Sequence, residues 1–242
     1  MMNAPRRIAL LLALLLSAGT STAHAPAPAS EWLSYRDAYR AMVMFQKYGG
    51  PKHYLQNQLQ LVPARQGAVV PDLRLILQTR DGDQYLALDP TGRAAFPLST
   101  AAYNENAPLL VSGGVGPVGF RARVSIVPRT NGLYDSAELR AACGQALDYL
   151  RYTDTSARAR ACVGVRFVYP HVGAAVVAPA PVRLRSGAAE AVAVALPVTQ
   201  GGAFPDDGQT GFRVVNYRFS HGAEPNQLIT SSTPLAITPL IE

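Results

Sequence analysis

Residues 88–97 read LDPTGRAAFP, and residues 196–205 read LPVTQGGAFP. The two segments agree at five of their ten positions, and each follows segments in which apolar residues alternate. The match continues downstream, where ENAPLLVS at 105–112 resembles EPNQLITS at 224–231. Repetition of this kind indicates a supersecondary unit used twice, although chance similarity in a chain rich in Ala, Gly and Pro remains the alternative. We therefore expect two tandem β-sandwich-like modules, at residues 52–130 and 163–242. Phe96 and Phe204, which precede the prolines of the two segments, should then be buried at equivalent positions.

Short strands are expected throughout both modules. Alternation of apolar residues, as at Leu73, Leu75 and Leu77, is typical of half-buried strands. An Asp81-Gly82 pair between two such runs predicts a hairpin turn, and it lacks the further oxygens that a calcium loop needs. The chain has 242 residues, is 48% hydrophobic and contains 20 Gly and 19 Pro. This composition excludes a disordered chain and limits long helices. The predicted class is mainly β (α+β).

Two helices are expected outside the modules. The first follows an extended spacer within residues 24–51. Ser34 with Asp37 indicates its N-cap, and Gly49-Gly50-Pro51 ends it. An aromatic and aliphatic stripe on this helix is interpreted as core-facing, with a ligand platform as the alternative: Trp32, Tyr35, Tyr39, Met42 and Val43. The second, residues 135–151, links the modules within residues 131–162, and Asp135 with Glu138 resembles a capping box.

The two cysteines of the chain are predicted to form a disulfide. Cys143 lies on the core face of the linking helix, and Cys162 begins an alternating strand. An even number of cysteines in an exported chain favours a bridge. The alternative, a nucleophilic thiol, needs a neighbouring base and a reduced cysteine.

The N-terminus has the pattern of a secretory signal peptide. Arg6 and Arg7 precede an apolar run at 8–16, and small residues follow up to Ala23. The run is about half the length that crosses a bilayer. We expect cleavage after residues 1–23, no transmembrane anchor afterwards, and a periplasmic or secreted protein.

Catalytic signatures are scarce. The segment Leu110-Val-Ser-Gly-Gly114 lacks the first Gly of a hydrolase elbow, and Gly113-Gly-Val-Gly116 lacks the Lys of a phosphate-binding loop. No zinc or cofactor motif gathers the histidines, which are His24, His53, His171 and His221. A glycosidase-like pair of carboxylates remains open, with four candidates beside predicted strands: Asp89, Glu105, Glu190 and Glu224.

The basic character of the chain comes from arginine. Lys and Arg number 22 against 16 Asp and Glu, a formal net charge of +6. Codon bias explains the Arg excess better than a polyanionic partner does, and no basic run with interleaved aromatics indicates nucleic acid. A possible anion patch lies near the cysteines, with a solvated surface as the alternative reading: Arg140, Arg151, Arg158, Arg160 and Arg166.

Several segments resemble a family of exported proteobacterial proteins of unknown function: GRAAFPL at 92–98, ENAPLLVS at 105–112, ACVGVRFVYP at 161–170 and STPLAITPL at 232–240. The resemblance implies a location in the bacterial envelope and transfers no functional residue. The predicted function is non-catalytic binding, scaffolding or assembly with an envelope protein, glycan or lipid. The alternative is a cell-wall polymer hydrolase.

Overall fold

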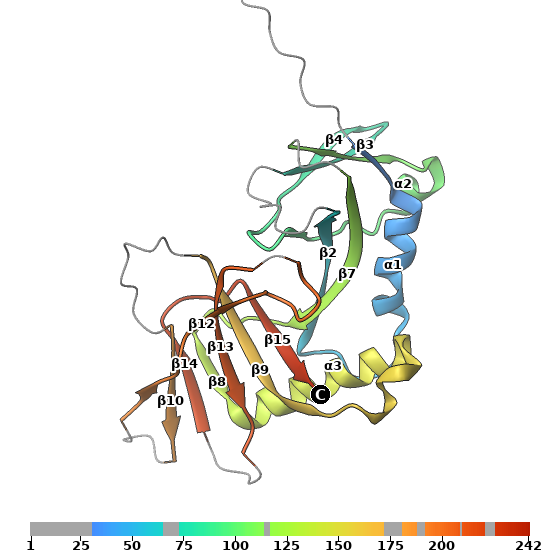
Figure 1. Ribbon diagram of the computed structural model, residues 1–242. Helices are drawn as coiled ribbons and strands as arrows, with labels where there is room; N and C mark the ends of the chain where they lie inside the picture. Colours follow the sequence, from blue (N-terminus) through green and yellow to red (C-terminus); the bar gives the residue numbers. More distant parts are fainter. Residues whose placement is uncertain are drawn as a thin grey trace, which may run out of the picture.

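The computed structural model shows a mainly β protein with three antiparallel sheets and three α-helices among its described residues (Figure 1). These residues are 31–64, 73–113, 117–171, 181–187, 192–208, 210–220 and 226–242. The predicted signal peptide and the predicted spacer at residues 24–30 lie outside them. Within the described part of the chain, no helix is long and apolar enough to span a membrane.

The largest sheet has seven strands and takes them from both halves of the chain. Its order is β12-β13-β9-β15-β7-β2-β5. The strands from the first half are β2 (Leu55–Pro63), β5 (Arg93–Ala94) and β7 (Val118–Ile126). The second half supplies β9 (Cys162–Tyr169), β12 (Thr199–Gly201), β13 (Phe212–Arg218) and β15 (Ala236–Ile241). A shared sheet joins the segments that sequence assigned to separate modules.

Two four-stranded sheets flank this large sheet, and their strand orders correspond. One has the order β1-β6-β3-β4, with β1 (Glu31–Ser34), β3 (Arg74–Thr79), β4 (Gly82–Leu86) and β6 (Pro108–Ser112). The other, read from β8, has the order β8-β14-β10-β11, with β8 (Leu133–Asp135), β10 (Val182–Ser186), β11 (Val194–Ala195) and β14 (Asn226–Thr230). In both sheets the strand that leads directly into a long helix lies at an edge.

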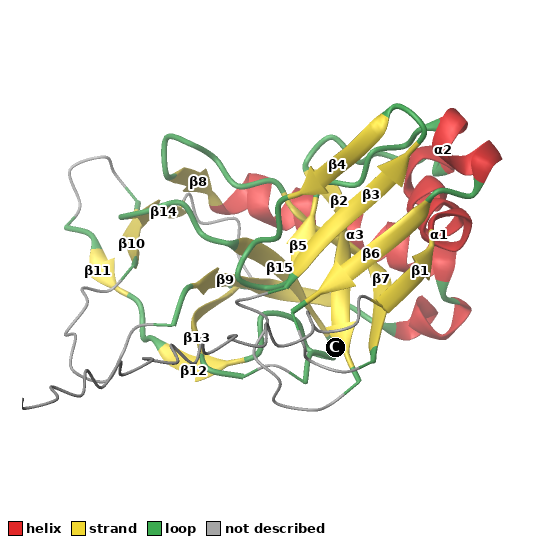
Figure 2. Ribbon diagram, turned by 90° about the horizontal axis from the view of Figure 1, so that it is seen from above, coloured by secondary structure: helices red, strands yellow, loops and turns green. Residues whose placement is uncertain are grey.

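The long helices cover one face of the large sheet in each half (Figures 1 and 2). Helix α1 (Tyr35–Lys47) packs on β2 and β7, and α3 (Ser136–Thr153) packs on β9 and β15. Each helix directly follows its edge strand, so the order strand, helix, strand begins both halves. A short helix that sequence did not predict, α2 (Thr100–Glu105), contacts α1. A 3₁₀ turn, η1 (Thr155–Ala159), follows α3.

The start signals of the two helices have different outcomes. Ser34 caps α1 as predicted, since its hydroxyl accepts a hydrogen bond from the Asp37 amide. Asp135 occupies the N-cap of α3 but its side chain makes no capping bond. Glu138 pairs with Arg129 instead, with 2.6 Å between Nη2 and Oε1. The predicted capping box is therefore wrong. The Glu138 carboxylate, which the box would need, forms an ion pair with Arg129 of the preceding turn.

The predicted aromatic stripe of α1 is only partly correct. Tyr35 and Met42 are buried, whereas Tyr39 is half-buried. Trp32 belongs to β1, not to the helix. The hairpin predicted at Asp81-Gly82 also forms, shifted by one residue: Thr79 pairs with Gly82, which has φ +125°. A side chain is rarely tolerated at that φ, which explains the glycine.

Candidate functional site

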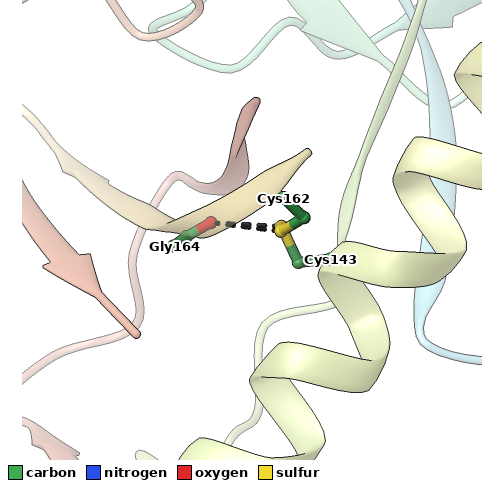
Figure 3. Close-up of a disulfide and its surroundings, with 3 residues drawn as sticks. All are labelled: Cys143, Cys162 and Gly164. Atoms are coloured by element: carbon green, nitrogen blue, oxygen red, sulfur yellow. Dashed lines mark hydrogen bonds between the residues drawn. A yellow bond between two sulfur atoms is a disulfide. The ribbon is translucent and has the colours of Figure 1, made fainter. Parts of the chain in front are cut away.

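The predicted disulfide is present. Cys143 on α3 and Cys162 at the start of β9 are bonded, with 6.0 Å between their Cα atoms (Figure 3). The Cys143 Sγ lies 3.1 Å from the carbonyl oxygen of Gly164. A Cβ on Gly164 would collide with the Tyr217 carbonyl of β13. This glycine therefore lets β13 approach the part of β9 that the disulfide ties to α3.

The predicted arginine patch is divided between separate places. Arg140 donates to the Ser220 carbonyl and lies over the Phe219 ring. Arg166 points to the other side of the large sheet and donates to Asn216 and to the Gly202 carbonyl. At the C-terminal end of α3 lie Arg151, Arg158 and Arg160, and Arg151 Nη2 donates to the Arg160 carbonyl at 2.8 Å. These three arginines are the part of the predicted patch that stays together, and Arg160 is the one among them that lines a pocket.

A buried cation that sequence analysis did not single out joins the two halves. Arg93 on β5 is 1% exposed. Its Nη2 lies 2.7 Å from Asp89 Oδ2, and its Nε donates to Thr91 Oγ1 at 2.8 Å. Its Nη2 also donates to the carbonyl of Leu235, which directly precedes β15. One guanidinium thus satisfies a carboxylate of the first half and a backbone oxygen of the second.

The turn at residues 203–207 packs against the first half beside Arg93. Phe204 is 4% exposed, with the guanidinium carbons of Arg93 and Arg123 lying 5.4 and 4.5 Å from its ring centroid. Arg123 Nη1 lies 2.7 Å from Asp206 Oδ1, and its Nη2 lies 2.9 Å from Asp207 Oδ1. Partial burial raises the pKa of Asp206, but the hydrogen bond and charge of Arg123, with the charge of a second arginine, lower this pKa overall.

The predicted equivalence of the two Phe-Pro corners is wrong in one respect. Phe204 is buried as expected, but Phe96 is only half-buried. Phe96 stacks on Tyr35 of α1, with 5.0 Å between the ring centroids. Their surroundings differ because two arginines of the first half cover Phe204, whereas Phe96 packs within its own half.

The large sheet is split between its halves. β7 pairs with β2 along its whole length, and β15 pairs with β9 from Ala236 to Ile241. Between β7 and β15, however, a single register pair is formed, Ile126 with Ile237. An antiparallel continuation would place Thr238–Ile241 opposite residues 122–125. The two strands separate beyond the first pair, as Figure 1 shows where β7 and β15 diverge.

The space left by this divergence is the candidate site, here called the slot. It has a volume of about 560 Å³, within the usual range for ligand pockets. Its walls are α1, α3 and the diverging strands, and the Phe204 turn closes one side. The lining is mainly apolar: Ala41, Met44, Ala122, Val124, Ala146, Tyr149, Leu150, Phe204, Pro205, Pro239 and Ile241.

The slot also has a small polar set, which comprises Arg123, Thr153, Arg160, Asp206 and Thr238. Thr238 is 1% exposed, and its hydroxyl has no hydrogen-bond partner among the described residues. Arg123 and Asp206 neutralise each other. Burial raises the pKa of the adjoining Tyr149 phenol, which keeps it uncharged.

Arg160 is the unpaired cation of the slot. Its backbone is held in place, because its amide donates to the Ala157 carbonyl and its carbonyl accepts from Arg151. Its side chain is exposed and forms no hydrogen bond or ion pair with the residues that the structure describes. Its charge contributes to lowering the pKa of Asp154, after the hydrogen bonds from Ser156.

The two candidate carboxylates that the structure describes are each paired with an arginine. Asp89 is engaged by Arg93, and Glu105 lies 3.2 Å from Arg80 Nε. Glu190 and Glu224 lie outside the described residues. A second pocket of about 560 Å³ lies between the β3–β4 hairpin and α2, where it includes Arg80 and Glu105.

The two histidines within the described ranges, His53 and His171, have different partners. His53 is exposed and contacts Gln145, and exposed His171 contacts the Gly211 carbonyl. His24 and His221 lie outside the described residues. Within the described part of the chain, no group of three or more His, Cys, Asp or Glu residues could hold a metal ion.

Comparison with known proteins does not add a relative. The chain matches no family model, no curated protein and no solved structure.

Sequence reasoning found Arg160 but missed Arg93, Arg123 and Thr238. One signal was available, since Arg93 and Phe204 both belong to the two repeated segments that opened the sequence analysis.

Proposed function

We propose that this protein is an exported, non-catalytic binding protein and that the slot is its ligand site. The observation that carries the proposal is the split between β7 and β15 in an otherwise continuous sheet. The split leaves a mainly apolar cavity whose lining includes the unpaired cation Arg160. Pockets that combine an apolar lining with a few polar groups are the usual sites of small-molecule binding.

The arrangement of charges supports binding over hydrolysis. A glycosidase needs one free carboxyl on each side of the bond to be cleaved. Asp89 and Glu105 are each paired with arginine. Among the described residues that line the slot, Asp206 is the single carboxylate, and it is paired with Arg121 and Arg123.

An envelope location is supported by the disulfide, which persists in oxidising compartments, and by the signal-peptide pattern. N-terminal sequencing of the exported protein tests this part of the proposal. We expect a mature chain that begins near His24, and retention of residues 1–23 on a membrane-embedded product would contradict it.

We also propose that the chain arose by duplication, with units at about residues 31–126 and 133–241. The support is the matching strand order of the two small sheets, each beginning with an edge strand that leads into a helix. These units differ from the modules expected at 52–130 and 163–242, because each contains its own long helix.

Ligand binding at the slot is testable with 1-anilinonaphthalene-8-sulfonate, an anionic apolar fluorophore. Ala41 is half-buried on α1 and lines the slot, so Ala41→Trp places an indole in the cavity. Ala141 is exposed on α3, and Ala141→Trp is the matched control. We expect saturable fluorescence enhancement in the wild type and the control, and at least tenfold weaker binding in Ala41→Trp.

Equal binding by Ala41→Trp, with unchanged circular dichroism, would refute the slot as the site. Release of soluble fragments from purified cell-wall polymer by the wild-type protein would instead favour the hydrolase alternative.

A further inference from the structure

We infer that the ligand is a long-chain acyl carboxylate, whose chain lies in the slot and whose carboxylate pairs with Arg160. This inference rests on the proposed function and specifies its ligand. Two features of the slot support this inference: its mainly apolar lining and the position of the unpaired cation Arg160.

The lining matches an alkyl chain. Side chains from α1, α3 and both strands present carbon to the cavity, with Met44, Ala146 and Ile241 as examples. Met44 is 39% exposed, so part of its side chain is open to solvent. Covering such surface with methylene groups is favourable by about 0.8 kcal/mol for each buried CH₂. A chain that enters between Met44 and Ile241 covers surface from both halves of the protein.

The charge at the slot matches an anionic head. Arg123 is neutralised by Asp206 and Asp207, which leaves Arg160 available. Arg160 lines the slot, is exposed, and its charge contributes to lowering the pKa of Asp154. Asp154 is already bonded to the Ser156 amide at 2.8 Å. A guanidinium binds a carboxylate well because its N–H groups match the two oxygens.

The strand edges favour an acyl chain over an extended peptide. A peptide that joins a sheet edge needs backbone donors and acceptors on that edge. Pro239 lacks a backbone N–H and lies in β15 at the slot. Proline is tolerated in strands where no ladder bond is required. Among the described buried side chains of the slot, Thr238 is then the one whose hydroxyl has no hydrogen-bond partner. An alkyl chain would neither satisfy this hydroxyl nor bury any further polar group.

The test uses the mature, oxidised protein after removal of bound lipid, and isothermal titration calorimetry below the aggregation concentration of each probe. Hexadecanoate is the probe, hexadecan-1-ol tests the chain alone, and acetate tests the head alone. Arg160→Gln removes the proposed partner of the carboxylate. Arg158→Gln is the matched control, since Arg158 is an exposed arginine of the same turn.

We expect one hexadecanoate per chain and no binding of acetate. Arg160→Gln should weaken hexadecanoate about two- to fivefold, the range for an exposed ion pair, and should not affect hexadecanol. Arg158→Gln should bind as the wild type. Met44→Glu, a change at an exposed position that leaves the fold intact, should weaken hexadecanoate at least as much as Arg160→Gln by placing an anion beside the chain.

Three results would overturn the inference: equal affinity of the wild type for hexadecanoate and hexadecanol, an unchanged affinity in Arg160→Gln, or displacement of the fluorophore by an extended apolar peptide but not by hexadecanoate. If Ala41→Trp blocks the fluorophore while hexadecanoate fails to bind, the acyl inference falls and the slot remains the ligand site. If Ala41→Trp has no effect on the fluorophore, both fall.

Discussion

Replacing Arg93 by methionine should destabilise the protein more than any other single change of a charged residue discussed above. The guanidinium is 1% exposed and makes contacts with Asp89, Thr91 and Ser125, besides the Leu235 carbonyl. Removing one partner of a buried ion pair costs about 3–5 kcal/mol. The Asp89 side chain is 23% exposed, and it keeps hydrogen bonds from the Thr91 amide and hydroxyl. We therefore expect the lower end, about 3 kcal/mol.

Urea denaturation of the oxidised protein, followed by far-ultraviolet circular dichroism, measures this loss. Arg74→Met is the matched control, because Arg74 is exposed on β3 and surface substitutions usually change stability by about 0.5 kcal/mol or less. The double variant Asp89→Asn with Arg93→Met should lose less than the sum of the single losses, by about 1–3 kcal/mol. A loss below about 1 kcal/mol for Arg93→Met, or strict additivity in the double variant, would refute the reasoning.

Three further outcomes are expected. Changing both Cys143 and Cys162 to Ser should lower the free energy of unfolding by about 2–5 kcal/mol, and two titratable thiols in the native wild-type protein would contradict the bridge. Phe204→Ala should lower the free energy of unfolding by about 3–5 kcal/mol because Phe204 is buried. Phe96→Ala should lower it by about 1–2 kcal/mol because Phe96 is half-buried, and equal losses in denaturation experiments would contradict the different surroundings described above. Asp206→Asn should lower stability at pH 7 by about 0.2–1 kcal/mol. Because the folded-state pKa of this carboxyl is below its unfolded value, the difference from the wild type should shrink as the pH falls through the folded-state pKa; a difference that grows on acidification would contradict this.

The sequence predicted those features that depend on neighbours along the chain. The strand at Leu73–Leu77 follows from alternation, the cap at Ser34 from its spacing to Asp37, and the disulfide from the phases of the flanking helix and strand. The capping box at Asp135 failed because Arg129 takes Glu138, a choice that depends on how the preceding turn folds.

The slot could not be predicted because it depends on where two distant strands stop pairing. Nothing near Ile126 signals that β15, more than a hundred residues later, pairs with it only once. Likewise Arg93 looks like an ordinary polar residue in GRAAFP until β15 supplies the Leu235 carbonyl. Arg160 was found as part of a basic cluster, but its separation from Arg140 and Arg166 depends on the tertiary fold.

The same geometry explains how the protein keeps a slot open without losing its sheet. The two halves are joined by one register pair between β7 and β15, by Arg93, and by the Phe204 turn that Arg123 and its aspartates hold. Contacts between α1 and α3 also join them, such as the Phe45 ring against the Tyr149 ring. Arg93 acts close to the point where β7 and β15 still pair, because its partner Leu235 lies two residues before Ile237. The Phe204 turn acts at the slot itself, where Phe204 packs against Arg123. Further pairing of β15 with β7 would close the cavity, and Pro239 opposes it by removing a donor from β15. A ligand chain that touches both α1 and Ile241 should therefore add to the contacts between the halves.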